Sequence, residues 1–266
     1  MAVWPIESCK IKKGHVRLKI KNIYLWHFRA TLLTSTSMKF LNVNFETQNT
    51  ILESFDNIAD KISKDINLKI NNAYYRLVDF EFYSFSKALP DPHTYKNDLQ
   101  LQNGKLYLHA SGVDITFGDG TNHGGILLRS IIKLYDGAEQ ENGFMKKQYD
   151  GPQVVATELF SNLYHLDSQE KNEIALIDID DHNQNASFYP ATKVIKTKRV
   201  GLAPKPTDKD DFYRNLELRY IAILPKFKNF KQTVKGIESI LGEKVIKGQI
   251  SAEDAREILE YKKNFT

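Results

Sequence analysis

The feature that most limits the possible folds is a series of strand-like segments with only turn signals between them. Residues 74–83 (YYRLVDFEFY) are aromatic, β-branched and alternating, which is typical of a strand. The segments 106–117 and 125–134 are also rich in β-forming residues, and the turn cluster GDGTNHG separates them. Pro90 and Pro92 interrupt regular structure before them. Strands in succession, without a helix after each, favour an α+β fold over a doubly wound parallel sheet.

Helical patterns are predicted on either side of this series. Residues 51–68 carry apolar side chains at spacings of three and four, which predicts an amphipathic helix. Residues 151–165 predict a helix that begins at Pro152. Residues 227–265 predict helices, the last beginning at Ser251 with acidic residues in its first turn. Further strands are expected within 16–33, 168–183, 194–200 and 216–224. The apolar positions of the first helix are Ile51, Leu52, Phe55, Ile58, Ile62 and Ile66.

Charge is distributed unevenly along the chain, although Lys+Arg (37) barely outnumber Asp+Glu (33) among the 266 residues. Residues 1–50 hold eight basic residues against two acids, and residues 190–235 hold twelve against four. Two such segments can meet in space as one face that holds phosphates, and the alternative is that they are solvated edges. A single cysteine, Cys9, excludes an internal disulfide, and no apolar run is long enough to span a membrane. We expect an intracellular, cytoplasmic protein.

Several common chemistry-bearing motifs are absent from the sequence. It contains no phosphate-binding GxxxxGK[ST] loop, no GxGxxG fingerprint, no GxSxG elbow and no CxxC pair. The acidic run at 178–182 lacks the glycine and the terminal bidentate acid of a calcium loop, so a solvated loop is favoured over a metal site. Asp114, Asp119 and His123 are similarly expected to be hairpin residues. No metal and no cofactor are predicted.

Glu81 is the unusual residue of the 74–83 strand, because Phe80, Phe82 and Tyr83 surround it in the sequence. A carboxylate in such a strand lies either on the outer face of the sheet or in a pocket lined by aromatic rings. In the second case, loss of hydration raises its pKa. The residues alone leave both alternatives open.

Six short motifs follow one another around and after this residue: Arg76-Leu-Val-Asp-Phe-Glu81-Phe-Tyr83, Asp91-Pro-His93, Gly104-Lys-Leu-Tyr107, Gly125-Ile-Leu-Leu-Arg129, Asp150-Gly151-Pro152 and Arg199-Val200-Gly201. In this order and spacing they resemble the alkyladenine (3-methyladenine) DNA glycosylase family, over about residues 70–224. The resemblance implies a single compact domain with a curved, mostly antiparallel sheet flanked by helices. It places the catalytic domain at 1–225 and a helical C-terminal extension at 226–266.

The resemblance also implies a mechanism in which a base is flipped out of double-stranded DNA and hydrolysed from its sugar. Glu81 corresponds to the general base that activates water, and Arg129 to the arginine that helps to hold that water. A backbone carbonyl near Ile195 is implied as the water's third partner. No lysine corresponds to a nucleophile, so we expect a monofunctional enzyme that leaves an abasic site without strand cleavage, acts as a monomer and serves repair or antiviral defence.

Two sets of binding residues follow from the same resemblance. The flipped base is expected to stack on aromatic rings, which returns roughly 1–3 kcal/mol per base, and to form hydrogen bonds with the pocket. The implied pocket residues are Tyr83, His93, Tyr107 and His109. The implied DNA contacts are Ser111, Gly112, Val113, Lys196, Lys198 and Arg199.

This chain departs from the family at three places. A pocket tyrosine is replaced by His109, and the tyrosine that wedges into the duplex is replaced by small residues within Ala110-Ser111-Gly112-Val113. An asparagine that guards the pocket is replaced at about Gly118. These changes remove bulk, so we expect the substrate to be a larger or hypermodified base, such as one carried by a phage genome, rather than 3-methyladenine. Val113 or another residue would then support flipping.

Two other functions are consistent with the sequence. The first is a non-catalytic DNA- or nucleotide-binding module on the same fold. The second is a metal-dependent nuclease that uses Asp79, Glu81 and Asp91. A glycosylase needs no added metal and leaves alkali-labile sites, whereas a nuclease requires a divalent ion and cuts without alkali.

Overall fold

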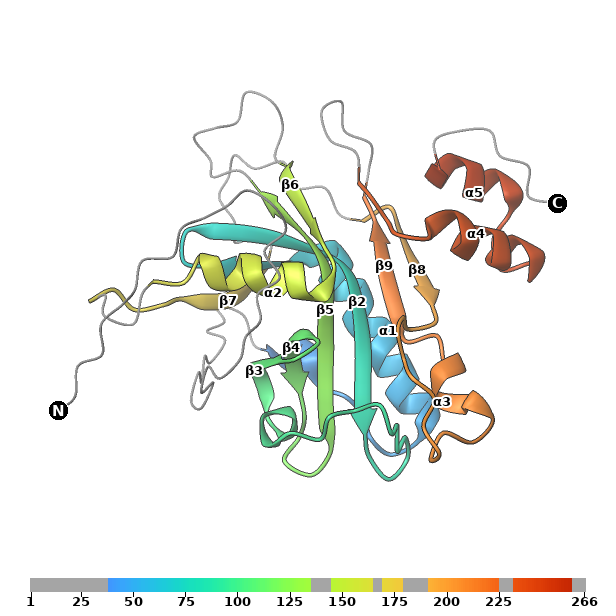
Figure 1. Cartoon of the computed structure of the whole chain (residues 1–266), viewed down its shortest axis with the longest axis horizontal. Helices are drawn as coiled ribbons and strands as arrows, with labels where there is room; N and C mark the ends of the chain where they lie inside the picture. The colour runs from blue at the N-terminus through green and yellow to red at the C-terminus, as the bar shows by residue number, and fades with distance from the viewer. Residues whose placement is uncertain (1–37, 135–144, 165–168, 179–190, 225–231, 260–266) are drawn as a thin grey trace, which may run out of the picture.

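Two long antiparallel strands, β2 (Ala73–Phe85) and β5 (His123–Leu134), form the centre of the protein (Figure 1). The computed structural model describes residues 38–134, 145–164, 169–178, 191–224 and 232–259. Both central strands are longer than the usual strand of five or six residues, so each has room for different neighbours at its two ends. The remaining strands are added at those ends.

The sheet branches from this central pair. On β5, the first half pairs with β4 (Gly112–Phe117), which pairs with β3 (Asn103–His109), and the second half pairs with β6 (Met145–Asp150). On β2, the first half pairs with β1 (Ile66–Ile70), which pairs with β7 (Ile174–Asp178). Its middle, Asp79–Glu81, pairs with β9 (Arg219–Ile223), which pairs with β8 (Lys193–Thr197). Every pairing among these strands is antiparallel, and the sheet curls into a half-barrel.

Helix α1 (Gln48–Asp65) covers one face of the sheet. It begins with a capping box, in which the Thr47 side chain accepts a hydrogen bond from the backbone N–H of Thr50. The ring of Phe55 stacks on Phe82 of β2 at 4.5 Å between centroids. Burial of each large apolar side chain contributes roughly 1.5–3 kcal/mol. The buried apolar side chains of α1 are Ile51, Phe55, Ile58, Ala59 and Ile62.

The predicted helix over 51–68 is too long at its end. Helix α1 ends at Asp65, and Ile66 begins strand β1. The segment INLKI places β-branched residues at its ends and joins β2 through a tight turn, where Asn71 takes a left-handed conformation (φ 51°) that asparagine tolerates well. Ile66 fits both a helical and a strand period, so periodicity alone did not separate the two.

Among the described residues, the other α-helices, α2 to α5, follow strand β6 in the chain. Helix α2 (Pro152–Ser161) begins at Pro152 as predicted and lies on the opposite side of the sheet from α1 (Figure 1). A short helix α3 (Phe212–Asn215) precedes β9. Helices α4 (Ile237–Ile246) and α5 (Ala252–Leu259) pack Leu241, Ala255 and Leu259 against β8 and β9. The predicted start at Ser251 is confirmed, because its Oγ accepts a hydrogen bond from the N–H of Asp254 at 3.0 Å. Short 3-10 helices are η1 (Met38–Leu41), η2 (Asp98–Leu101) and η5 (Lys209–Asp211).

Two irregularities face each other in the central pair of strands. Leu77 is paired with Ile131, Asp79 with Ser130 and Phe80 with Leu128, so Val78 on β2 and Arg129 on β5 are each an extra residue. Bulges of this kind redirect side chains and are frequent beside functional sites. Here Arg129 lies two residues from Leu127, the partner of Glu81, so it points to the same side of the sheet as Glu81, which it contacts.

The predicted fold class is confirmed: the protein is α+β, a single compact domain with a curved antiparallel sheet flanked by helices. The division at residue 225 stays a prediction. The expected strand within 16–33, Cys9, and Asp180, Asp181 and His182 of the acidic run lie outside the described residues. Within the described ranges, no helix combines the length and the apolar content that a bilayer crossing requires.

Candidate active site

Alternation along β2 separates the core from a cavity on the other face of the sheet. Phe80 and Phe82 point into the core, so Glu81 and Tyr83 point to the opposite side. A cavity of about 380 Å³ lies there, within the size range of small-molecule sites. Its walls come from β2, the β3–β4 hairpin, β5, the start of α2 and the loop after β8, and include Tyr83, His93, Tyr95, His109, Arg129 and Lys205.

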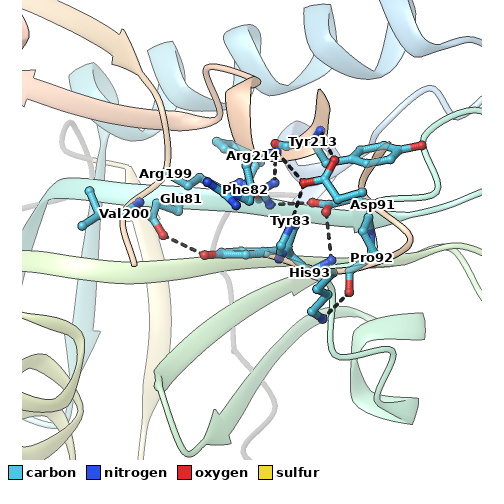
Figure 2. A network of polar contacts seen from close by, with 12 residues as sticks. Glu81, Phe82, Tyr83, Asp91, Pro92, His93, Arg199, Val200, Tyr213 and Arg214 are labelled. Carbon is cyan, nitrogen blue, oxygen red and sulfur yellow. Dashed lines mark hydrogen bonds and ion pairs between the residues drawn. The ribbon is translucent and has the colours of Figure 1, made fainter. Parts of the chain in front are cut away.

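Glu81 lies below the cavity wall and is fully buried. The hydroxyl of Tyr83 donates to Oε2 at 2.8 Å, and the backbone N–H of Val200 donates to Oε1 at 2.8 Å (Figure 2). Nη1 of Arg129 forms an ion pair with Oε1 at 3.3 Å. Burial raises the pKa of Glu81, although the charge of Arg129 and the two hydrogen bonds oppose this. The sequence left two alternatives for Glu81, a solvent-exposed outer face and a pocket lined by aromatic rings, and its burial excludes the first.

Arg129 has unused hydrogen-bond donors at the cavity. It lines the cavity and lies 4.0 Å from Asp79 in addition to Glu81. None of its side-chain N–H groups makes a hydrogen bond with a described residue, and its Nε is buried without one. A buried, unsatisfied donor in a native structure is expected to serve a ligand or an ordered water. Arg129 is therefore ready to hold a polar atom beside the Glu81 carboxylate.

His93 is held by a buried carboxylate. Its Nε2 lies 3.1 Å from Oδ2 of Asp208, whose Oδ1 accepts the backbone N–H of Tyr213 and whose Oδ2 accepts that of Arg214. Burial tends to raise the pKa of Asp208, but these hydrogen bonds hold the pKa below its ordinary value. An ionised Asp208 accepts a proton-bearing Nε2, so in neutral His93 the Nδ1 atom is an acceptor. Among the described residues, Nδ1 of His93 has no partner.

His109 has a different environment on the neighbouring wall. Its Nε2 lies 2.9 Å from Oδ1 of Asp114, and its Nδ1 accepts the backbone N–H of Ser111 at 3.2 Å. Both ring nitrogens are therefore occupied, and His109 offers the cavity only its ring surface. The ring of Tyr95 packs on it at 4.7 Å, and that of Tyr107 at 5.0 Å. Tyr107, a predicted pocket residue, does not line the cavity but packs beside His109.

The prediction that Arg199 contacts DNA is wrong. Its side chain is fully buried and forms an ion pair with Asp91 at 2.5 Å. The guanidinium also donates to the carbonyls of Phe82 and Tyr213 and stacks over the ring of Tyr83 at 4.6 Å (Figure 2). A guanidinium with these partners cannot reach phosphates. Arg199 instead supports Tyr83 from behind the cavity.

The predicted role of Ile195 is also corrected. Ile195 belongs to β8, and its side chain is buried against α4 and α5. It is paired with Ile221 of β9, so a whole strand separates it from β2. The residue of this segment that reaches Glu81 is Val200, and it contributes an N–H donor rather than a carbonyl.

The other predicted DNA contacts have varied positions. Ser111 is exposed at the rim of the cavity, and its Oγ contacts the hydroxyl of Tyr95 at 2.8 Å. Val113 is fully buried in the core, so it can neither wedge into a duplex nor contact DNA. Lys196 forms an ion pair with Asp56 of α1 on the core side of the sheet. Lys198 is exposed and donates to Asn215, which leaves it accessible.

Two of the small residues have a structural explanation. Gly112 is buried, and a Cβ there would lie 2.8 Å from the Cβ of Pro152, so its small size lets α2 pack on the hairpin. A Cβ on Gly118 would lie 2.1 Å from the carbonyl oxygen of Gln100 and would clash with the backbone of η2. Neither glycine therefore widens the cavity by removing bulk from its wall. Of the residues in the three family departures, His109 and Ser111 line the cavity, with Ser111 at its rim.

The carboxylates proposed for a nuclease do not converge. Asp79 forms two hydrogen bonds with Arg219, Asp91 pairs with Arg199, and Glu81 pairs with Arg129. Each carboxylate thus has its own arginine, whereas a divalent ion requires several carboxylates around one point. No group of three or more metal-binding side chains occurs within the described part of the chain. The geometry does not support the nuclease alternative.

Three polar residues that shape the site were not found from the sequence: Tyr95, Asp208 and Lys205. Tyr95 and Lys205 line the cavity, and Asp208 orients His93. All three lie in irregular loops, where periodicity gives no indication of side-chain direction. The signal available in the sequence was a concentration of polar and turn residues (APKPTDKDD) directly after the Arg199-Val200-Gly201 motif.

Comparison with known proteins gives no functional assignment. No model of a known protein family matches the chain. Over 208 residues it is 25% identical to uncharacterized protein L759 of Acanthamoeba polyphaga mimivirus, which corresponds to 68% of this chain and 91% of that protein. The name of that protein states no activity. The function must therefore be argued from the site itself.

Proposed function

We propose that the protein is a DNA glycosylase that flips a damaged or modified base out of double-stranded DNA and hydrolyses its glycosidic bond. One observation carries the proposal: the buried Glu81–Arg129 ion pair at the floor of a cavity lined by Tyr83, His93 and His109. Both the motif order and this arrangement agree with the resemblance to the alkyladenine glycosylase family. The reaction class needs no metal or cofactor.

Each residue has a defined task in this proposal. Glu81 takes a proton from the attacking water, and its raised pKa makes it a stronger base than an exposed carboxylate. Arg129, with its unused donors, orients that water. His109 and Tyr83 provide ring surfaces for stacking, and Nδ1 of His93 accepts a hydrogen bond from the base. Arg199 and Asp208 position Tyr83 and His93.

The substrate is proposed to be a modified base rather than 3-methyladenine. The support is the presence of His109, which has a smaller ring than tyrosine and no free ring nitrogen. A base that carries an added group, as in some phage genomes, would use the space above this ring. The structure restricts the argument to this one position, because Gly112 and Gly118 are explained by packing.

The test is the release of bases from a panel of natural and phage genomic DNAs and from alkylated duplexes, measured by mass spectrometry without added metal. We expect one class of modified base to be released, which leaves an abasic sugar in the DNA. Glu81→Gln should lower the rate by roughly 10²–10⁴-fold, the usual contribution of a general base. Glu53→Gln, an exposed change on α1, is the matched control and should leave the rate unchanged.

A second candidate is a non-catalytic DNA- or nucleotide-binding module, and one observation favours it. Both oxygens of Glu81 are already hydrogen-bonded by Tyr83 and Val200, and the carboxylate is fully buried. Each carboxylate oxygen can accept a second hydrogen bond, which leaves water a place. If the protein retains DNA but releases no base from any member of the panel, the module is the better description.

A further inference from the structure

The loop after β8 brings a primary amine into the cavity. Its Val200 N–H is bound to Glu81, and at its other end Asp208 is bound to His93. Between these two anchors Lys205 lines the cavity, and its Nζ donates to the carbonyl of Pro92 at 2.5 Å. Pro92 directly precedes His93, which the close-up in Figure 2 shows beside Tyr83. The loop is thus fixed at three points around the site, with the amine in the middle.

The partner of this amine is a neutral carbonyl, as Lys198 also has a neutral partner in Asn215, whereas other lysines are paired with carboxylates. Lys196 is paired with Asp56, and Lys244 with Glu217. Lys205 has no carboxylate within ion-pair distance among the described residues, and its one hydrogen-bond partner there is a neutral carbonyl. A carboxylate would hold the proton on the amine, whereas a nucleophilic lysine must lose it.

We propose that Lys205 is a second catalytic residue, which captures the abasic deoxyribose that base removal leaves and cleaves the strand on its 3′ side. This rests on the proposed function for the choice of substrate, and it replaces the expectation that no strand cleavage occurs. The abasic sugar in its ring-opened form carries an aldehyde at C1′. An aldehyde bound in the cavity and the amine of Lys205 on its wall are the reactants of imine formation.

The steps balance without an oxidant or reductant. Neutral Nζ of Lys205 adds to C1′, and uptake of one proton from solvent with loss of one water gives a protonated imine. Nδ1 of His93, the free acceptor on the adjacent wall, takes a proton from C2′. The electron pair of that C–H bond forms the C2′–C3′ double bond while the C3′–O bond breaks, and the phosphate leaves with the oxygen. Water then hydrolyses the imine, which returns the amine and releases an unsaturated aldehyde.

The experiment uses a duplex in which a single abasic site has been made beforehand by removal of uracil with a separate enzyme. The protein is mixed with it in sodium cyanoborohydride, which reduces an imine to a stable amine. We expect a covalent protein–DNA product, and incision when the reductant is omitted. Lys205→Ala should reduce trapping at least 100-fold while binding to abasic DNA is retained. Lys209→Ala, an exposed lysine outside the cavity, is the matched control and should trap like the wild type.

The outcomes separate this inference from the proposed function. Because the abasic site is supplied, trapping does not depend on base removal, so trapping without base release refutes only the glycosylase. Base release without trapping, by a protein that binds abasic DNA, overturns the role of Lys205. Equal trapping by Lys205→Ala and the wild type also overturns it, because another amine would then react. Lys205 is exposed, so its replacement is not expected to affect folding, and the unfolding midpoint checks this.

Discussion

The Arg199–Asp91 pair gives the sharpest test of the structure, since the sequence places Arg199 on the DNA and the structure places it in the interior. Both side chains are fully buried. Replacement of Arg199 by Met keeps much of the volume but removes the charge, the hydrogen bonds to two backbone carbonyls and the stacking on Tyr83. What remains is an aspartate whose Oδ1 still accepts the N–H of His93 while its Oδ2 has lost its counter-ion.

The size of the effect follows from this arrangement. Removal of one partner from a buried ion pair costs about 3–5 kcal/mol, because the other charge stays buried without compensation. Native domains are stable by roughly 5–15 kcal/mol, so Arg199→Met should remove a large part of the free energy of unfolding. Urea unfolding followed by circular dichroism measures the loss as a lower midpoint at unchanged slope. A surface substitution would change the free energy by less than about 0.5 kcal/mol.

The double variant Arg199→Met, Asp91→Asn completes the test. Since the second change removes the stranded charge, it should recover part of the lost stability, with a coupling energy within the usual range of about 0.5–3 kcal/mol. The reasoning is refuted by two results together: Arg199→Met is as stable as the wild type, and the slope of log binding constant against log salt concentration decreases by about one. The second result is the signature of a lost phosphate contact.

Two further predictions concern the site and the DNA surface. Glu81 must be ionised to act as a base and burial raises its pKa, so activity should be lost as the pH falls through a value above the ordinary 4.5. Arg129→Met removes the opposing positive charge and should move this acid limb of kcat/KM to higher pH. If the acid limb does not move, it belongs to a group other than Glu81. Lys198→Ala should weaken DNA binding and reduce the slope of log binding constant against log salt concentration by about one. Lys196→Ala should leave this slope unchanged, because that lysine is neutralised by Asp56. Equal slopes for the two variants would contradict this placement of the two lysines.

Part of this architecture follows from the sequence for identifiable reasons. The alternation around Glu81 predicts strand β2, and the same alternation sends Phe80 and Phe82 to the core and Glu81 to the cavity. Pro152 and Ser251 start their helices because each has the backbone or side-chain chemistry that a first turn requires. These signals are local, so a single sequence is sufficient to detect them.

The parts that were not predicted depend on contacts distant in the sequence. Arg199 resembles an ordinary basic residue until Asp91, 108 positions away, is brought against it. Asp208 is separated from His93 by 115 positions and lies in a loop without periodicity. Strand β6 is mostly polar (MKKQYD), so neither alternation nor apolar content indicates it. Charge and composition show that such residues are present, but only the folded chain determines which of them remain in water.

The opposed extra residues Val78 and Arg129 have a consequence for sequence change in the central strands. Each shifts the pairing of its own strand by one position, and together they cancel, so Leu77 with Ile131 and Phe80 with Leu128 keep the same register on both sides of the irregularity. Loss of either residue alone would exchange the inner and outer sides of the strand beyond it, and apolar side chains would then point into the cavity. Insertions and deletions here are tolerable only as matched pairs, one in each strand, so β2 and β5 must change together as the sequence diverges.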